Sequence, residues 1–371
     1  MFASLNCFGG MFKRDKQSQK TVGENGEDFS VVRDVHLFSY KDLILATKNF
    51  HPENKIGAGG FGTVYKGVLK DGAMVAVKQL SAESRQGVRE FLTEIATISA
   101  IKHENIVTLH GCCIEEDHRI LVYQYMENNS ISHALFGSSN GTINLDWQTR
   151  CKICVGTARG FAYLHEEVTP YIVHRDIKAS NVLLDGDLNP KIADFGLAKL
   201  FPDNITHIST RVAGTLGYLA PEYAMRGRLT RKADVYSFGV LVIEIISGRS
   251  NINTSLSLEE KVLLKMTWQL YEENRLLELV DPQLEEYSKE EALLFIKVAL
   301  LCTQALPRAR PTMSQVVKML TEGHTFTEKS ISRPGFISTD LKVLQSRDSS
   351  SLTSRLEDAS TSTSTSTFTS T

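Results

Sequence analysis

The chain has 371 residues, of which 42% are hydrophobic and 23% are charged, so its length suffices for one large or two modest domains of ordinary globular composition. The formal net charge of −2 does not favour a nucleic-acid-binding protein. The six cysteines, spread over a chain of this length, exclude the disulfide framework of a small secreted domain.

Residues 1–35 are polar and rich in turn-forming residues, which predicts a flexible leader. A secretory signal is not expected, because no basic region precedes a long apolar core, and Phe2 excludes the N-myristoylation pattern. Cys7 precedes a basic stretch at 13–16, where S-acylation would attach the chain peripherally to the plasma membrane, although a free thiol is the favoured interpretation. Because no run of about 18 apolar residues occurs, we expect a cytoplasmic protein without a membrane span.

The first half of the folded region predicts a small β-rich unit. A short lead-in helix is expected within 36–55, capped by Ser39, and residues 56–80 alternate between apolar and polar side chains as in antiparallel hairpins. Apolar residues at helical spacing predict a helix over 88–101, and another strand is expected over 119–126.

Beyond residue 145 the apolar spacing is mostly helical, which together with the preceding strands predicts an α+β fold of two lobes with the active site between them. We expect a folded domain at 56–323, divided into an N-lobe at 56–126 and a C-lobe at 127–323. The Ser/Thr-rich stretch 324–371 does not bury enough apolar surface to offset its ordering entropy and is expected to be disordered. The predicted helices cover 147–167, 232–248, 258–273, 290–304 and 313–320.

Cys151 and Cys154 have the spacing of half a zinc site. No second pair of Cys or His with matching spacing is evident, and the surrounding pattern is helical. Packing of these two side chains in a helical core is therefore the favoured interpretation.

Gly57, Gly59 and Gly62 form a GxGxxG pattern within the segment Ile56–Val64. Such glycines often mark only a hairpin turn, but they also allow backbone N–H groups to approach phosphate oxygens closely. A dinucleotide-binding fold would continue with a helix, whereas here an alternating strand follows and carries Lys78. This order favours a Gly-rich hairpin that covers a nucleotide, with Lys78 reaching its phosphates.

Several charged residues lie in apolar surroundings and need partners, because an unpaired buried charge is very costly. Lys78 ends an otherwise apolar strand, and Glu90 and Glu94 flank the apolar stripe of the helix that follows. Geometry alone does not choose between the two acids, and either could be a solvated surface residue. Glu222 also lies in a buried-looking context, with Arg310 either its partner or an ordinary surface arginine.

A polar insert interrupts the apolar stretch 172–184. It carries Asp176, Lys178 and Asn181, and Asp194 follows in a second short β-piece that is expected to lie close in space. Two carboxylates with an Asn provide hard oxygen ligands for Mg²⁺ and an acceptor for the proton of a substrate hydroxyl. The insert is therefore a candidate site for Mg²⁺ and for chemistry at a substrate hydroxyl.

Together these motifs resemble the eukaryotic protein kinase family, and their order and spacing match over about 260 residues. The resemblance implies that Glu222 and Arg310 form a buried structural ion pair. The matching motifs are Gly57–Val64, Val75–Lys78, His174–Asn181, Asp194–Gly196 and Ala220–Glu222.

The resemblance implies an ATP site between the lobes. Tyr123 would guard the back of this site, and Lys78, paired with Glu94, would contact the α- and β-phosphates. Gly57, Gly59 and Gly62 would cover the phosphates. The adenine would lie among Ile56, Val64, Ala76 and Leu183, with backbone hydrogen bonds to the segment from Gln124 to Met126.

The resemblance also implies the catalytic roles. Asp176 would orient the substrate hydroxyl and accept its proton, while Lys178 would steady the γ-phosphate. Asn181 and Asp194 would hold Mg²⁺. Thr215 is expected to be structural or to contact Asp176 and Lys178.

Residues 38–50 and 103–113 resemble the plant receptor-like kinase group, and specifically its cytoplasmic branch. The motif at 176–181 resembles the Ser/Thr form rather than the tyrosine kinase form, with dual specificity for Tyr left open. The implied reaction is transfer of the ATP γ-phosphate to protein Ser/Thr hydroxyls, with a membrane receptor kinase upstream and no nucleic-acid partner. The alternative is a catalytically silent pseudokinase or scaffold that binds nucleotide, which would have lost a chemistry-bearing residue, and none is lost.

The loop 197–219 offers hydroxyl groups for regulatory phosphorylation. Arg175 lies beside the catalytic Asp, and a phosphate on this loop would bridge it to nearby cations. By its place in the family pattern Thr210 is the first choice, followed by Ser209 and Thr206. A loop that is ordered without modification is the alternative.

Overall fold

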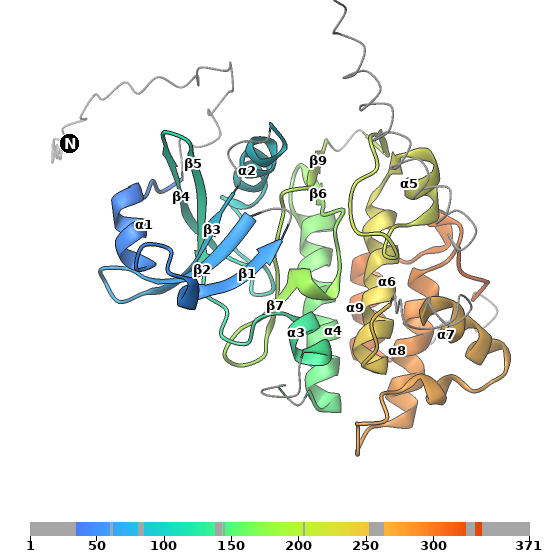
Figure 1. Ribbon diagram of the computed structural model, residues 1–371. Coiled ribbons are helices and arrows are strands. Elements are labelled where there is room, and N and C mark those ends of the chain that lie inside the picture. The colour runs from blue at the N-terminus through green and yellow to red at the C-terminus, as the bar shows by residue number, and fades with distance from the viewer. Residues whose placement is uncertain are drawn as a thin grey trace, which may run out of the picture.

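The computed structural model describes residues 35–59, 62–80, 85–137, 143, 145–202, 205–251, 263–323 and 331–335. In this part of the chain a small β-rich lobe lies beside a larger helical lobe, which confirms the expected α+β, two-lobed fold (Figure 1). The expected leader with Cys7, and the stretch beyond residue 335, lie outside the described residues.

The N-lobe is built on a five-stranded antiparallel sheet with the strand order β1-β2-β3-β5-β4. The predicted hairpins are confirmed, and in one of them Val64 lies directly opposite Lys78. The strands are β1 (Lys55–Gly59), β2 (Gly62–Val68), β3 (Met74–Gln79), β4 (Leu109–Glu115) and β5 (His118–Gln124).

Alternation along β3 decides which side chains face the cleft, because successive residues of a strand point to opposite faces. Val75 and Val77 are fully buried on the face that carries helix α1 (Tyr40–Ala46), where they join a small apolar cluster with Leu43. Lys78, next in the chain, therefore faces the other way, towards helix α2 (Arg85–Ile98) and the C-lobe.

The lead-in helix is shorter than its sequence pattern suggests. Ser39 caps α1 as expected, because its hydroxyl accepts a hydrogen bond from the backbone N–H of Asp42 at 3.1 Å. The helix ends at Ala46, after which Thr47 directs its hydroxyl to the carbonyl of Leu43 and three consecutive residues adopt positive φ angles. A 3₁₀ turn, Pro52–Asn54, leads into β1.

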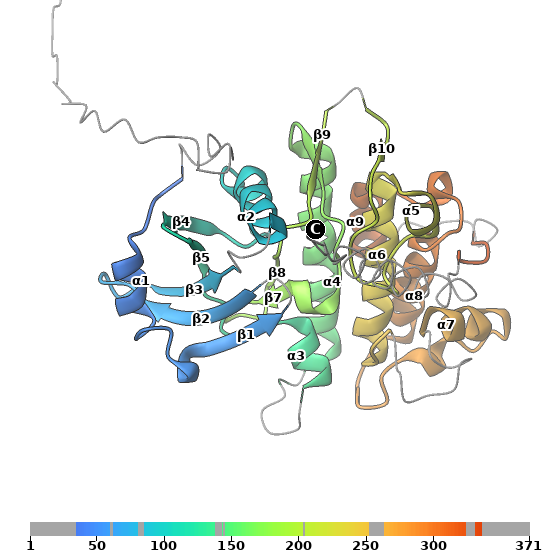
Figure 2. The same ribbon diagram turned by 45° about the horizontal axis from the view of Figure 1, so that its top comes forward.

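The C-lobe is assembled around helix α6, which lies among the other C-lobe helices (Figure 2). Every residue of α6 from Ala233 to Ser247 is buried. A helix that is buried on all sides belongs in the core of a large domain. None of the described helices is long and apolar enough to cross a membrane. The other C-lobe helices are α3 (Ile131–Phe136), α4 (Trp147–Ala162), α5 (Pro221–Arg226), α7 (Leu263–Glu272), α8 (Lys289–Cys302) and α9 (Met313–Glu322), and α6 itself spans Arg231–Ser247.

Short strands in the C-lobe bring the predicted catalytic segments together. Strand β7 pairs with β8, so the two segments that carry Asn181 and Asp194 leave neighbouring strands at one end of this small sheet. Strand β6 pairs with β9, and β10 pairs with β11. The strands are β6 (Tyr171–Val173), β7 (Val182–Leu184), β8 (Pro190–Ile192), β9 (Lys199–Phe201), β10 (Ile208–Ser209) and β11 (Arg228–Leu229).

The packed part of the chain continues past the expected boundary at residue 323, and this corrects part of the tail prediction. Residues 331–335 lie against the C-lobe, with Ile331 and Pro334 buried. The reason is local, because Gln304 offers both an amide donor and an acceptor to the backbone of Ser332. A Ser/Thr-rich composition does not reveal such a short docked segment.

Candidate active site

A cavity of about 440 Å³ lies between the two lobes. The glycine hairpin covers it, β3 and β5 form its N-lobe wall, and the predicted catalytic loop forms its floor. Among the residues that line it are Ile56, Gly57, Gly59, Gly62, Val64, Ala76, Lys78, Glu94, Tyr123, Gln124, Met126, Lys178, Asn181, Leu183 and Asp194. Segments far apart in the sequence thus place the predicted nucleotide residues around one cavity.

Gly62 begins β2 with a φ angle of +127°, a conformation that L side chains rarely adopt. A Cβ atom at this position would also collide with the backbone carbonyl of Gln79. The glycine therefore lets the hairpin lie close against β3, which brings its backbone over the cavity.

Lys78 contacts two carboxylates inside the cavity. Its Nζ atom lies 3.0 Å from Glu94 Oε2 and 2.7 Å from Asp194 Oδ1. Burial by itself would lower the pKa of Lys78, but the two carboxylates outweigh it and raise the pKa well above its usual value. Lys78 is therefore a permanent cation held at a fixed place.

The partner of Lys78 on helix α2 is Glu94, which the sequence pattern alone did not decide. Glu90, one turn earlier, accepts a hydrogen bond from Gln86 Nε2 at 2.9 Å. Burial raises the pKa of Glu90 and outweighs the opposing effects of the hydrogen bond from Gln86 and of the charge on Lys78. The two acids are thus in different environments although they are both buried on one helix.

Asp176 is surrounded by donors on the floor of the cleft. Thr215 donates its hydroxyl hydrogen to Asp176 Oδ1 at 2.6 Å, and Lys178 Nζ lies 2.9 Å from Oδ2. Asn181 Nδ2 donates to the same Oδ2 at 3.1 Å, and Lys178 also donates to Thr215 at 3.0 Å. The expected contact of Thr215 with Asp176 and Lys178 is confirmed.

A buried carboxylate that the sequence analysis missed holds the catalytic loop in place. Asp234, in the first turn of α6, accepts the backbone N–H groups of His174 at 2.7 Å and Arg175 at 2.9 Å. His165 Nε2 lies 2.9 Å from the same carboxylate. The only signal in the sequence is an acid within the long apolar run of α6, and it gives no indication of its partners.

A second buried acid of α6, Glu244, was also missed. The hydroxyl of Tyr218 donates to both carboxylate oxygens at 2.7 Å, and the backbone N–H of Asn251 donates to one of them at 2.7 Å. Burial raises the pKa of Glu244 to about 7. Because Tyr218 follows Thr215 by three residues, this cluster fixes the segment that borders Asp176.

Arg175 lies beneath the loop where phosphorylation was predicted, and it is 9% exposed. Its guanidinium group donates to the carbonyls of Leu197 and Arg211, each at 2.9 Å, and to the hydroxyl of Tyr223. The arginine thus ties the catalytic loop to this loop and to α5. The three candidate sites differ in exposure: Thr206 and Ser209 are exposed and Thr210 is half-buried.

The predicted ion pair of the C-lobe is present. Arg310 donates to Glu222 through both terminal nitrogens, at 2.7 and 2.8 Å, and its side chain is fully buried. The guanidinium also donates to the carbonyls of Gln304 and Lys232. This pair joins α5 to the segment that follows α8. Helix α5 begins just after the loop 197–219, which is the activation loop.

Asn181 and Asp194 fit a hard-oxygen metal site. The Asn181 amide nitrogen is directed at Asp176, which leaves its oxygen as a ligand, and the Asp194 carboxylate lines the same cavity. Burial would raise the pKa of Asp194, but Lys78 outweighs it and holds the pKa below its usual value. Mg²⁺ usually binds one or two carboxylates together with substrate phosphates and waters, so this sparse donor set suits a metal that arrives with a nucleotide.

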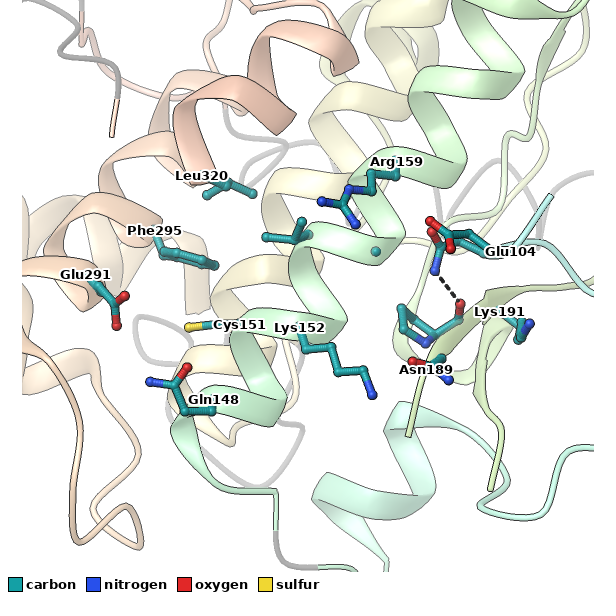
Figure 3. A pocket seen from close by; sticks show the side chains of 14 residues that line it. Glu104, Gln148, Cys151, Lys152, Arg159, Asn189, Lys191, Glu291, Phe295 and Leu320 are labelled. Carbon is teal, nitrogen blue, oxygen red and sulfur yellow. Dashed lines mark hydrogen bonds between the residues drawn. The ribbon is translucent and has the colours of Figure 1, made fainter. Parts of the chain in front are cut away.

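A second cavity, of about 460 Å³, borders α4, and its lining includes none of the predicted catalytic residues. Figure 3 shows the side chains that line it. Cys151 and Lys152 project from α4 towards it, and Phe295 and Leu320 come from α8 and α9. Cys154 is buried in the core, and burial raises its pKa and that of the Cys151 thiol, the latter to about 12, so both thiols are protonated at neutral pH.

Residues 50–320 match the family described as "Protein kinase domain". The chain belongs to the protein kinase family. The kinase is 59% identical over 321 residues to "Cold-responsive protein kinase 1" of Arabidopsis thaliana, which covers 85% of this chain and 82% of that protein.

Two further relatives from the same plant are each named as a probable leucine-rich repeat receptor-like serine/threonine-protein kinase. One is 59% identical over 302 residues, or 81% of this kinase and 29% of the relative. The other is 59% identical over 292 residues, or 78% of this kinase and 28% of the relative. The kinase therefore spans less than a third of the length of these receptor-like relatives. The predicted membership of the plant receptor-like kinase group is confirmed at the level of the kinase domain.

Proposed function

We propose that this chain is an active Ser/Thr protein kinase that transfers the γ-phosphate of ATP to hydroxyl groups of protein substrates. The observation that supports it most is that Lys78, Asn181 and Asp194 line one cleft, with Lys78 held by Glu94. Asp176 lies next to this cleft and accepts a hydrogen bond from Asn181. A silent pseudokinase would have lost at least one of these groups. The relatives named as serine/threonine-protein kinases are consistent with the same activity.

In this proposal the N-lobe binds and orients ATP. The adenine lies between apolar side chains of the two lobes, with Gln124–Met126 supplying backbone hydrogen bonds and Tyr123 closing the rear. Lys78 presents its charge to the phosphate oxygens, and Glu94 keeps its side chain from folding back onto Asp194 alone. A bound Mg²⁺, held by Asn181 and Asp194, would neutralise charge on the phosphates and favour transfer.

The floor of the cleft acts on the second substrate. A hydroxyl group placed beside Asp176 donates its proton to the carboxylate as its oxygen attacks the γ-phosphorus, while the bond from the γ-phosphorus to the bridging oxygen breaks and ADP leaves. Thr215 and Asn181 fix the carboxylate for this step. Lys178 Nζ lies 2.9 Å from Asp176 Oδ2, and beside this carboxylate its charge would stabilise the oxygens of the transferred phosphoryl group. Residues 176–181 resemble the Ser/Thr form of the family, which supports Ser and Thr as acceptors.

Control by phosphorylation of the loop 197–219 belongs to the same proposal. Thr210 is our first candidate, followed by Ser209 and Thr206. Ser209 lies directly opposite Arg228 in the β10-β11 pair, and Lys199 is exposed on β9, so cations are present along the loop. A receptor kinase upstream, as the receptor-like relatives suggest, would be one source of this phosphate.

The decisive experiment is an assay of the purified full chain with Mg²⁺ and γ-³²P-ATP on a generic basic protein. We expect label on Ser and Thr after acid hydrolysis of the product, and its loss in the Asp176→Asn variant. A chain that binds ATP with ordinary affinity but transfers no phosphate would overturn the proposal in favour of the scaffold.

A further inference from the structure

The C-terminal segment Ile331–Gly335 is fastened to the C-lobe outside the part of the chain that matches the kinase domain, which ends at residue 320. Gln304 Nε2 donates to the Ser332 carbonyl at 2.8 Å, and the Ser332 backbone N–H donates to Gln304 Oε1 at 3.1 Å. Farther along, the hydroxyl of Tyr236 on α6 donates to the Gly335 carbonyl at 2.8 Å. The segment is thus held at both ends.

Gly335 lies at the edge of a groove. A Cβ atom at this position would lie 2.7 Å from Pro221 Cγ and 3.1 Å from the Cα atom of Ala305. Both residues line a groove of about 570 Å³ between α5 and the segment after α8. Gly335 therefore lies against the wall of this groove.

The groove is apolar inside and basic at its rim. Met225 and Leu306 line it and are 60% and 55% exposed, which places them among the most exposed large apolar side chains of the described residues. Exposed apolar side chains gathered in one hollow are typical of a surface that another segment covers.

The charges of the groove favour an acidic occupant. Arg226, Arg228 and Arg308 line it, all three are exposed, and none has an ion-pair partner within the described part of the chain. Glu222 also lines it, but Arg310 engages that carboxylate. The groove therefore fits a short apolar stretch followed by negative charge.

The sequence after Gly335 begins with two apolar residues, Phe336 and Ile337, and the acidic Asp340 follows. We propose that Phe336 and Ile337 occupy the groove, with Asp340 towards its arginine rim. Attachment at Gly335 makes the contact intramolecular, and a tether of a few residues corresponds to an effective concentration in the millimolar range. The two side chains would cover Met225 and Leu306 without needing a separate partner.

An occupied groove would join α5 to the segment after α8 on the outer side of the Glu222–Arg310 pair. The first residues of the C-terminal extension would then be part of the folded C-lobe and would support the end of the activation loop, whether or not the chain is catalytically active.

Thiol accessibility in the full chain tests this directly. Met225→Cys places a thiol in the groove, and Leu45→Cys, at a residue that is also 60% exposed but lies on α1, is the matched control. Each cysteine variant is made in two backgrounds, one with the unchanged extension and one that also carries Phe336→Asp and Ile337→Asp. All four proteins are then treated with a maleimide. Labelling of the two peptides is followed by mass spectrometry, so that the native cysteines do not interfere.

We expect the Met225→Cys thiol to react at least tenfold more slowly with the unchanged extension than with the two Asp substitutions. The Leu45→Cys thiol should react equally fast in both, and Phe368→Asp, an equivalent change near the end of the chain, should leave the protection intact. Equal rates at position 225 in both backgrounds would overturn the proposal. So would protection that disappears on dilution, because it would assign the groove to a second copy of the chain.

Discussion

Single residues in the cleft are distinguished by their partners rather than by their burial. Glu90 and Glu94 lie one turn apart on α2, both are at most 5% exposed, and only Glu94 contacts Lys78. Asp176 and Asp194 likewise line one region but have different neighbours, since Thr215 and Asn181 donate to the first and Lys78 to the second. These contacts allow sharp tests of the proposed roles.

Asp176→Asn should abolish most turnover and leave ATP affinity nearly unchanged. The amide has no basic oxygen to take the hydroxyl proton, and such groups contribute roughly 10²–10⁴ in rate. Measuring kcat together with nucleotide affinity checks both halves. A variant that keeps more than about a tenth of the wild-type kcat would remove Asp176 from the mechanism.

Glu94→Gln should lower kcat/KM by roughly ten- to a hundredfold, because a hydrogen bond to a charged group contributes about 1.5–3 kcal/mol. Glu90→Gln is the matched control, since a glutamine there keeps a hydrogen-bond acceptor for Gln86. It should change kcat/KM by no more than about twofold. The reverse order of effects in steady-state assays would contradict the assignment of Glu94.

At the scale of elements, α6 carries the C-lobe core and also positions the active site. Its first turn holds the catalytic loop through Asp234, and its last turns hold the segment after Thr215 through Glu244. Both acids are at most 1% exposed. The helix therefore couples apolar packing to the geometry of the cleft, and its carboxylates make that coupling sensitive to charge.

Glu244 should make stability depend on pH near neutrality. Its pKa in the folded chain is about 7, above the 4.5 of an exposed Glu, because burial disfavours the charged form. Its contribution is thus fully present below about pH 4.5 and is lost as the pH rises through 7. A shift of this size corresponds to about 3 kcal/mol.

The measurement is the difference in unfolding free energy between the wild type and Glu244→Gln, from urea titrations between pH 5 and 8. Because Gln does not titrate, the wild type should lose stability relative to the variant as the pH rises. A difference that stays constant across this range would show that Glu244 titrates at its ordinary pKa.

At the scale of the whole molecule, the activation loop connects the catalytic loop, α5 and the cleft between the lobes. Arg175 donates to carbonyls of this loop. The hydroxyl oxygen of Tyr223, on α5, accepts hydrogen bonds from Arg175 and from the backbone N–H of Ala213. The loop is therefore already tied to the catalytic loop by neutral partners. A phosphate would add a charged partner to this network.

The phosphorylation proposal predicts a lag. Chain that was expressed with a phosphatase should start slowly and speed up during incubation with Mg·ATP, while Thr210→Ala should stay slow. One to three charge-assisted hydrogen bonds to a phosphate imply a gain of at least about tenfold in kcat/KM. Ser209→Ala and Thr206→Ala serve as site controls. Full activity of both the dephosphorylated wild type and Thr210→Ala without a lag would exclude this switch.

The sequence alone determined the two-lobed fold and the order of the motifs. These properties depend on local periodicity and on spacing along the chain, which short-range interactions reveal. The resemblance to a family was needed to choose Glu94 over Glu90, because the two residues lie on the same side of one helix and the choice depends on where α2 sits relative to β3.

Tertiary structure alone decided the contacts that join distant segments. Asp234 accepts hydrogen bonds from residues about 60 positions earlier, Glu244 receives the hydroxyl of Tyr218, and Gln304 holds the backbone of Ser332. In the sequence these are isolated polar residues in apolar or Ser-rich surroundings. A buried polar group must find a partner, but its partner is fixed by packing in three dimensions and leaves no periodic signal along the chain.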